Sequence, residues 1–324
     1  MQTIQFHSYL SSQLDKFVEL RRLSGTDYSS QTRLLMYFDR FLIEQYPNEL
    51  TVTRHIIEHY LQSISYLRPR VQFNRFCVAR QICRYIAQTD PCCYVPESMK
   101  CITASKVFHP YIFGKQEIKS LLSAASTLLP LGSLRSHTYQ TLFGLLYTTG
   151  IRIGEAFSLT LKDFHAEHEL LYIAEGKFRK ARWVPLHPST SQVLKQYVER
   201  RLQVGTREPD SPLFINLRAH HLCHCTVYET FRQLLEKCGI PHHKHAGPRI
   251  HDLRHTFAVH RLLDWYQNKQ DVNAMLPALA TYMGHVCVSS THVYLHPTTE
   301  LLEQVNNRFH NHYLRNFDAK GGEL

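Results

Sequence analysis

Six side chains spread over the second half of the chain could together transfer a phosphoryl group. In chain order they are Arg152, Lys177, His251, Arg254, His285 and Tyr294. Two guanidinium groups can clamp the nonbridging oxygens of a phosphate and stabilise the extra charge of the transition state. A phenol can attack phosphorus when a neighbouring base accepts its proton, and a lysine can protonate a leaving alkoxide. This set predicts phosphoryl transfer without a metal ion or other cofactor.

The first of these residues lies between two expected helices. An apolar helix over residues 137–149 ends at Gly150, and a new helix begins at Gly154. At such a junction, backbone amides and the Arg152 guanidinium can converge on an anion. Many arginines at helix junctions only pair with a carboxylate. Glu155 is a candidate partner, and we expect it to orient the site rather than to react.

A basic turn carries the lysine. Expected strands over residues 170–174 and 182–186 flank four cations, at Lys177, Arg179, Lys180 and Arg182. The tip of such a hairpin can enter a DNA groove and place one ammonium group against a bridging oxygen. A solvated charged turn has the same composition, so this segment alone leaves both interpretations open.

Histidines occur in the two remaining motifs. His251 and Arg254 are three residues apart and share one face at a helix start, which favours a bound phosphate. We expect His255, one residue further on, to be structural. Gly284 suits a helix C-cap and would place His285 in a turn. Tyr294 follows nine residues later, and a single tyrosine is most often a half-buried core residue.

The composition indicates a globular protein with a polyanionic partner. The chain has 324 residues, 37 Lys and Arg against 27 Asp and Glu, and a formal net charge of +10. This excess favours nucleic acid or an acidic membrane surface as the partner. No apolar run reaches the roughly 18 residues of a membrane span, and no secretory signal is visible, so we expect a cytoplasmic protein. Nine cysteines fit reduced thiols rather than a disulfide framework.

Hydrophobic spacing divides the chain into two regions that are mainly α-helical, with a small β-sheet in the second. Residues 1–90 predict a four-helix domain, with helices over 6–23, 30–46, 52–64 and 69–88. Ser29 or Ser30 is a plausible N-cap for the second of them. Five arginines of this domain form either a solvated face or one that tracks phosphates: Arg68, Arg70, Arg75, Arg80 and Arg84.

A linker over residues 91–110 separates this domain from a second one over residues 111–324. The linker holds Pro91, Pro96 and Pro110 and few periodic apolar positions. Helices are expected in the second domain over residues 115–128, 137–149, 190–203, 226–238, 253–265, 271–283 and 300–309.

The motifs in this order resemble those of the tyrosine recombinases, also called the phage integrase family. The matching segments are residues 149–155 (TGIRIGE), Gly176-Lys177 with residues 184–186 (VPL), residues 251–258 (HDLRHTFA), and Gly284-His285 with Tyr294. The resemblance covers most of residues 111–297. It departs from the usual residue types at positions 156–157 and at Met283, and neither departure touches the expected chemistry.

The resemblance implies an N-terminal helical (SAM-like) core-binding domain and an α/β catalytic domain that close around double-stranded DNA. It implies that Arg152, Arg254 and His285 hold the scissile phosphate. It further implies that Tyr294 forms a 3′-phosphotyrosyl bond, that Lys177 protonates the leaving 5′-hydroxyl, and that His251 helps to move the tyrosine proton. Members of the family act without ATP, as tetramers on specific recombination sites, and pass through a Holliday junction. Sister recombinases can join such an assembly, and the tail after the tyrosine would pack on a neighbouring protomer.

Three alternatives stay open at this point. A type IB topoisomerase shares the tyrosine chemistry but reseals the same strand, and a DNA-binding protein that no longer cuts would keep only the fold. A metal site is the third, because His220, His221, Cys223, His224 and Cys225 crowd one loop, and His242, His243 and His245 another. The paired ligand spacing of a closed zinc site is missing, so we expect no specific metal. The sequence also leaves open whether the chain is a mobile-element integrase, a transposase or a dimer resolvase.

Overall fold

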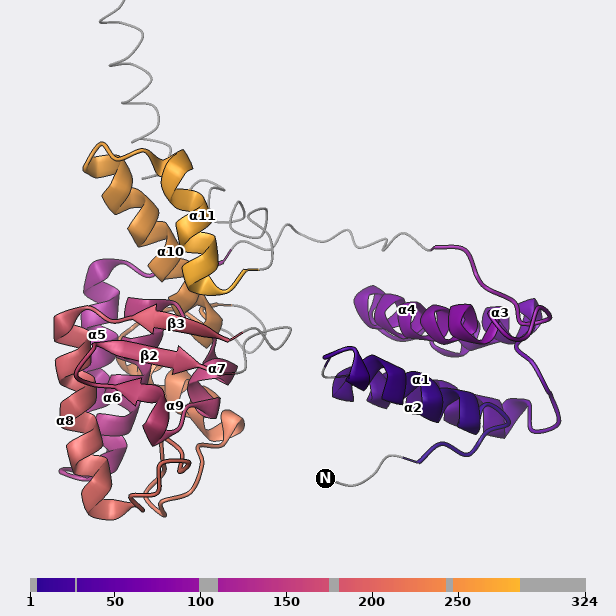
Figure 1. Cartoon of the computed structure of the whole chain (residues 1–324), viewed down its shortest axis with the longest axis horizontal. Helices are drawn as coiled ribbons and strands as arrows, with labels where there is room; N and C mark the ends of the chain where they lie inside the picture. The colour runs from indigo at the N-terminus through magenta and orange to yellow at the C-terminus, as the bar shows by residue number, and fades with distance from the viewer. Residues whose placement is uncertain (1–4, 27, 99–109, 175–180, 243–246, 286–324) are drawn as a thin grey trace, which may run out of the picture. The chain divides into compact units, whose positions relative to one another are not determined.

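The computed structural model divides into two compact units, residues 1–108 and 109–324 (Figure 1). It describes residues 5–26, 28–98, 110–174, 181–242 and 247–285. Lys177 and Tyr294, most of the predicted linker and the helix expected over residues 300–309 lie outside the described residues.

The described part of the N-terminal unit contains the four predicted helices. They are α1 (Ser11–Leu23), α2 (Ser29–Gln45), α3 (Arg54–Ser63) and α4 (Pro69–Ile86). Apolar residues three and four apart place Leu35, Phe38 and Leu42 of α2 on one buried stripe. That stripe packs with the buried faces of the other helices into a single core.

The first helix begins later than predicted. Helix α1 starts at Ser11 rather than at residue 6. The backbone N–H groups of His7 and Ser8 each donate to the buried carboxylate of Asp39, at 3.0 Å. These bonds hold the segment before α1 in a non-helical conformation against α2.

The predicted serine cap of the second helix is wrong. Ser29 and Ser30 are already inside α2, and the residue before the helix is Tyr28, without a side-chain cap. The Tyr28 ring packs edge-on against Phe17 of α1, with ring centroids 5.7 Å apart. Packing between helices, rather than a hydroxyl cap, therefore sets this boundary.

The arginines expected on one face of α4 differ in what they contact. The Arg75 guanidinium lies over the Tyr37 ring, 3.9 Å from its centroid, and Arg80 Nε donates to the carbonyl of Pro96 at 2.7 Å. Arg68, Arg70 and Arg84 are exposed. Two of the five cations thus bind other parts of the unit, and three reach solvent.

The C-terminal unit is helical around one small antiparallel sheet. Its described elements are α5 (Lys115–Ser126), α6 (Leu134–Thr149), α7 (Ile153–Ser158), a 3₁₀ turn η1 (Leu161–Asp163), β1 (Phe164–His165), β2 (Leu170–Ile173), β3 (Arg182–Pro185), α8 (Pro188–Val204), α9 (His224–Lys237), α10 (Ile250–Gln267) and α11 (Val272–Met283). The strand order is β1-β2-β3, and Ile173 of β2 faces Arg182 of β3. The mainly α class with a small sheet is confirmed, and the sequence missed β1, which is too short to show a period.

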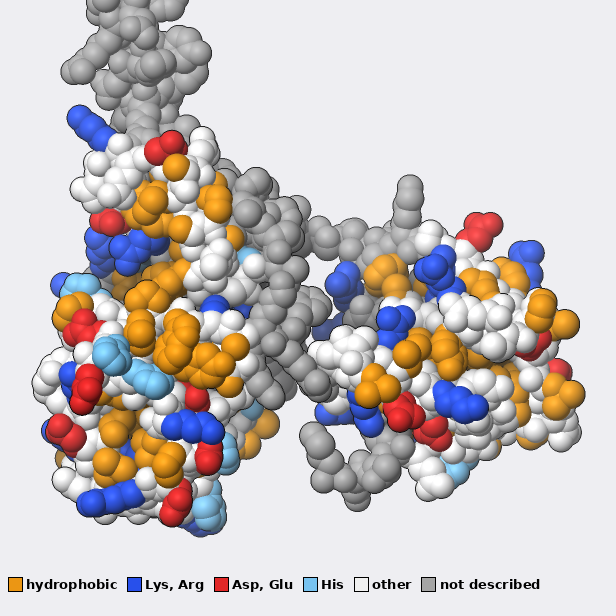
Figure 2. Space-filling view, in the orientation of Figure 1, with side chains coloured by type: hydrophobic (Ala, Val, Ile, Leu, Met, Phe, Trp, Pro, Cys, Tyr) orange, Lys and Arg blue, Asp and Glu red, His pale blue; other side chains and the backbone are white. Residues whose placement is uncertain are grey.

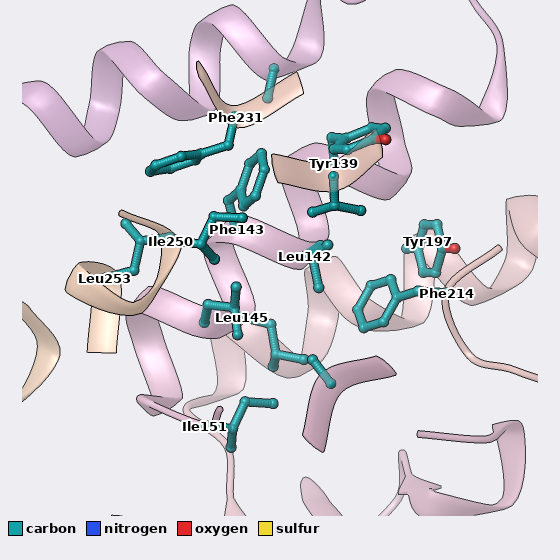
Figure 3. Close-up of a cluster of buried hydrophobic side chains, with 14 of the residues drawn as sticks. Tyr139, Leu142, Phe143, Leu145, Ile151, Tyr197, Phe214, Phe231, Ile250 and Leu253 are labelled. Atoms are coloured by element: carbon teal, nitrogen blue, oxygen red, sulfur yellow. The ribbon is translucent and has the colours of Figure 1, made fainter. Parts of the chain in front are cut away.

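Helix α6 is the centre of the main core. It packs against α5, α8 and α10, and its buried residues point in all directions, as expected for a helix enclosed by others. Figure 3 shows Leu142, Phe143 and Leu145 of α6 among side chains of the surrounding elements, including Phe231 and Leu253. Because α6 ends at Thr149, three residues before Arg152, this core fixes the start of the candidate site.

The outer face of the sheet is aromatic and faces solvent. The Trp183 ring lies 4.7 Å from Tyr172 and 4.9 Å from His165, measured between centroids. Figure 2 shows hydrophobic and histidine side chains gathered on this side of the unit. Residues alternate along β3, so Trp183 points out while Arg182 and Val184 point inward.

Gly150 ends α6 in a way that other residues would disturb. Its φ is +62°, and a Cβ there would lie 2.4 Å from Cδ1 of Phe257. We expect Gly150→Ala to lower the free energy of unfolding by about 2–4 kcal/mol, from left-handed strain and overpacking. Both tryptophans, Trp183 and Trp265, lie in this unit, so fluorescence-detected urea unfolding of the whole protein measures the effect there.

The matched control for that change is Gly154→Ala. Gly154 has no heavy atom within 4 Å of a built Cβ, and its φ lies outside the left-handed region. This control should shift the unfolding midpoint little. Equal midpoints for the two variants would contradict the assigned role of Gly150.

Candidate active site

Four of the six predicted residues lie in the described structure. Arg254 contacts His285 directly, and Arg152 donates to Gly284, the residue before His285. Arg152 precedes α7, Arg254 lies in the second turn of α10, and His285 follows α11. The turn between α6 and α7 and the end of α11 thus meet at the start of α10 (Figure 1).

Arg152 is held by its own helix and by the end of α11. Its backbone N–H donates to Glu155 Oε2 at 2.9 Å, and its Nη1 donates to Glu155 Oε1 at 2.7 Å. Its Nη2 donates to the carbonyl of Gly284 at 3.1 Å. The expected pairing with Glu155 is confirmed. These bonds fix the plane of the guanidinium group while part of the side chain still reaches solvent.

Arg254 joins the ends of two helices. Its side chain is buried, with 2% of the residue exposed. Nη1 donates to the carbonyl of Gly150 and Nη2 to that of Met283, the latter at 2.8 Å. Both carbonyls lie at helix C-termini, where the helix dipole favours a cation. The left-handed cap Gly150 and Met283, the residue before the left-handed cap Gly284, therefore bring their carbonyls to one buried arginine.

His285 lies directly after the second of these caps. Its Nε2 is 2.8 Å from Nη2 of Arg254. A guanidinium has no acceptor, so Nε2 accepts this hydrogen bond and the ring proton is on Nδ1. Burial first, then the charges of Arg254, Arg152 and Arg182, lowers the pKa of His285 to about 4. The ring is neutral at pH 7 and can donate through Nδ1.

Arg182 is a site residue that sequence reasoning assigned only to the charged turn. Its Nη1 and Nη2 donate to the two oxygens of Glu155, at 3.1 and 2.8 Å, and its Nε donates to the carbonyl of Tyr282 at 3.0 Å. The alternation of β3 could have found it, because Arg182 is two residues from the buried Val184 and so shares its inward face.

The Glu155 carboxylate is buried between two cations. Only 5% of the residue is exposed. Burial alone would raise the pKa of Glu155, but hydrogen bonds and charge from Arg182 and Arg152 outweigh it and lower the pKa to about 2. The carboxylate is therefore ionised at neutral pH, so it cannot act as a general acid, and its low pKa makes it a weak base.

Stability should depend on this carboxylate at acid pH. In the folded protein the pKa of Glu155, about 2, lies below its ordinary value of 4.5. The contribution of Glu155 to the free energy of unfolding is therefore full above pH 4.5. It is then lost by about 1.4 kcal/mol per pH unit as the pH falls toward 2. We expect the gap in unfolding free energy between the wild type and Glu155→Gln to shrink between pH 5 and pH 3. A gap that stays constant in urea unfolding over this range would contradict the assignment.

His251 lies in the first turn of α10 with its ring reaching solvent. Surrounding protein atoms, followed by the charges of Arg254 and Arg249, lower the pKa of His251. The His255 ring packs edge-on against it, with centroids 5.0 Å apart. Burial and the neighbouring His251 lower the pKa of His255 to about 4. Both imidazoles are thus neutral at pH 7, and His251 is the one that can accept a proton from a bound substrate or nucleophile.

Arg249 and Asp252 form an ion pair at the start of α10 that the sequence did not predict. Arg249 Nη2 donates to the buried carboxylate of Asp252 at 2.9 Å, and the Arg249 backbone N–H donates to the same group at 2.8 Å. Thr256 Oγ1, one turn further, accepts from the backbone N–H of Phe113 at 3.0 Å. These bonds fasten the helix that carries His251 and Arg254.

The histidine- and cysteine-rich loops show no metal centre in the residues that can be described. Among them, no group of three or more His, Cys, Asp or Glu side chains could hold a metal ion. Cys223 and Cys225 are exposed free thiols at the start of α9, and His243 and His245 fall in an undescribed segment. In the same described ranges, no helix is long and apolar enough to cross a membrane.

Comparisons with known proteins cover nearly the whole chain. Residues 112–300 match the sequence model of the phage integrase family. A putative integrase/recombinase, y4rB of Sinorhizobium fredii, is 35% identical, over 91% of this chain and 95% of the relative. The tyrosine recombinase XerD of Lacticaseibacillus casei is 30% identical, over 64% of this chain and 66% of that protein.

Solved structures show the same fold. The Tn1549 transposon integrase in complex with transposon right end DNA has a TM-score of 0.66 at 16% identity, covering 94% of this chain and 99% of that one. The XerH site-specific recombinase bound to its difH substrate in a post-cleavage complex has a TM-score of 0.62 at 19% identity, covering 91% and 83%.

Proposed function

The chain belongs to the phage integrase family, and we propose that this tyrosine recombinase cleaves and rejoins DNA at specific sites through a 3′-phosphotyrosyl intermediate. The proposal is carried by the way in which Arg152, Arg254 and His285 are all held at the end of α11, where Arg152 contacts Gly284 and Arg254 contacts Met283 and His285. Two cations and a neutral imidazole donor at one helix end suit a phosphodiester with two nonbridging oxygens.

The proposed cleavage step uses the two site residues that fall outside the described ranges. The Tyr294 phenol oxygen attacks phosphorus while His251, neutral at pH 7, accepts its proton. The bond from phosphorus to the 5′-oxygen breaks, and Lys177 donates a proton to that oxygen. Arg152 and Arg254 stabilise the charge that develops on the nonbridging oxygens.

Rejoining reverses these steps with a different strand. A 5′-hydroxyl from the partner duplex gives its proton to Lys177 and attacks the phosphotyrosine. The bond from phosphorus to the phenol oxygen breaks, and the phenol leaves with the proton that His251 returns. The bond energy is kept in the covalent intermediate, so neither ATP nor a metal is required. We place the reaction in the cytoplasm, within a homotetramer on two DNA sites that passes through a Holliday junction. Sister recombinases can contribute protomers.

The N-terminal unit supplies the second half of a DNA clamp in this proposal. Its exposed Arg68, Arg70 and Arg84 can contact phosphates, since arginine is the usual residue for that contact. The net charge of +10 supports a polyanionic substrate, and the named structural relatives that bind DNA support the same class of partner.

A plasmid assay tests recombination against simple relaxation. Two direct repeats of the DNA flanking the protein's own gene are placed on a supercoiled plasmid and incubated with the protein in EDTA. Recombination predicts two circles of defined size, and Tyr294→Phe should give none. Relaxation of a plasmid without these repeats, with no deletion, would favour a type IB topoisomerase, and binding without either product would favour a protein that no longer cuts.

A further inference from the structure

Arg182 connects three elements of the candidate site, because it lies on β3 and contacts Glu155 of α7 and Tyr282 of α11. We propose that Arg182 is a positioning residue that orients Arg152 for phosphate binding, acting through the Glu155 carboxylate. This inference rests on the proposed function, and it assigns a role to a residue of the β-sheet that has no part in the chemical steps above.

Arg152 and Arg182 share the Glu155 carboxylate. Its Oε1 accepts from Arg152 Nη1 at 2.7 Å and from Arg182 Nη1 at 3.1 Å. Its Oε2 accepts from the Arg152 backbone N–H at 2.9 Å and from Arg182 Nη2 at 2.8 Å. Each oxygen therefore has one donor from each arginine. The carboxylate cannot turn or shift toward Arg152 without breaking a bond to Arg182.

Arg152 and Arg182 also donate hydrogen bonds to the same end of α11. Arg182 Nε donates to the carbonyl of Tyr282 at 3.0 Å, and Arg152 Nη2 donates to that of Gly284 at 3.1 Å. A Cβ on Gly284 would lie 2.8 Å from Nη1 of Arg182 and 2.9 Å from its Cζ. The guanidinium thus rests against the glycine, and His285 comes next in the chain. This contact fixes the position from which the Arg182 guanidinium holds the Glu155 carboxylate.

Only a guanidinium can make this set of contacts. Arg182 donates through Nη1 and Nη2 to the Glu155 carboxylate and through Nε to the carbonyl of Tyr282, and its side chain is only 11% exposed. Lysine offers one compact charge and cannot form this fork. Without Arg182, Arg152 alone would neutralise the buried carboxylate, and it would be drawn toward Glu155 and away from the phosphate.

The test measures covalent cleavage of a nicked duplex in a single turnover. The duplex carries the DNA flanking the protein's own gene. We expect Arg182→Gln to slow adduct formation on the order of 100-fold, the size expected for a misplacement of about 1 Å. Arg182→Lys, which keeps the charge without the fork, should fall between the wild type and Arg182→Gln. Trp183→Ala, on the same strand but the opposite face, should cleave at the wild-type rate.

A double variant separates positioning from general damage to the fold. Since Arg182 acts through Glu155, the variant with both Arg182→Gln and Glu155→Gln should cleave no more slowly than the slower single variant. Rate losses that multiply would overturn the proposal, as would a wild-type rate for Arg182→Gln. Slowing of Trp183→Ala to the same degree would also overturn it, because the effect would then belong to the strand as a whole.

A modified substrate shows which catalytic residue Arg182 serves. When sulfur replaces the 5′-bridging oxygen, the leaving group needs no proton because a thiol is far more acidic than an alcohol. Arg182→Gln should stay slow on this substrate, since Arg152 and not the leaving-group acid is affected. Full recovery of the rate would overturn the assignment. A wild-type protein that forms no adduct on any of these duplexes would instead refute the proposed function.

Discussion

Replacing Arg254 by lysine should lower the rate of covalent DNA cleavage by about 100- to 1,000-fold, the loss expected when one preorganised donor to the transition state is removed. The wild-type guanidinium contacts Gly150, Met283 and His285 at once, within a buried site. A lysine ammonium keeps the charge but cannot contact both helix ends and still face a phosphate. Single-turnover cleavage of a nicked duplex measures the rate, and a gel-shift titration measures DNA affinity.

The same helix offers the control for Arg254. Arg261 is 46% exposed and pairs with Asp264 at 3.6 Å, two turns further along α10. We expect Arg261→Lys to cleave at the wild-type rate. DNA affinity should change by only a few-fold in Arg254→Lys, because most affinity comes from phosphate contacts elsewhere. A cleavage rate within a few-fold of the wild type would contradict the role given to Arg254.

Replacing Lys177 by alanine should slow covalent DNA cleavage by a factor similar to or larger than that for Arg254→Lys. Lys177→Ala should slow cleavage by about 100- to 10,000-fold, the range for loss of a general acid. The leaving 5′-oxygen would then depart as an alkoxide without a proton. A duplex with sulfur at the 5′-bridging position should restore most of the rate, because that leaving group does not need an acid.

Lys180→Ala is the matched control for Lys177→Ala, because Lys180 belongs to the same basic segment of the sequence. Loss of a general positive charge would affect both lysine variants alike, whereas loss of the acid affects Lys177 alone. Lys177→Ala that stays slow on the sulfur substrate would exclude protonation as its function. In that case, equal slowing of Lys180→Ala would point to a general effect of positive charge, and wild-type cleavage by Lys180→Ala would point to a phosphate contact of Lys177.

Much of the fold could be predicted because its helices have clear apolar periods. The central helix α6 and the helices around it were found within a few residues of their ends, and both glycine caps were predicted from residue type alone. The start of α1 and the cap of α2 were wrong because they depend on Asp39 and on Phe17, which come from other helices. Sequence spacing within one segment contains no information about such contacts.

The site could be predicted as a set of residues but not as a geometry. Motif spacing identified Arg152, His251, Arg254 and His285, and the structure brings them to one region. The carbonyl partners of Arg254 could not be predicted, because they join residues 104 and 29 positions away in the chain. Arg182 was missed because its charge suggested solvent, while the alternation of its strand put it inside. Lys177 and Tyr294 remain predictions from the motifs.

We expect Tyr294 to form a covalent bond to DNA in a site that needs no metal. To test this, the purified protein is incubated in EDTA with nicked duplexes from the DNA flanking its gene. The expected result is an SDS-resistant adduct, absent in Tyr294→Phe, whose DNA-linked peptide maps to Tyr294. An adduct that persists in Tyr294→Phe, or one that forms only when a divalent metal is added, would contradict it.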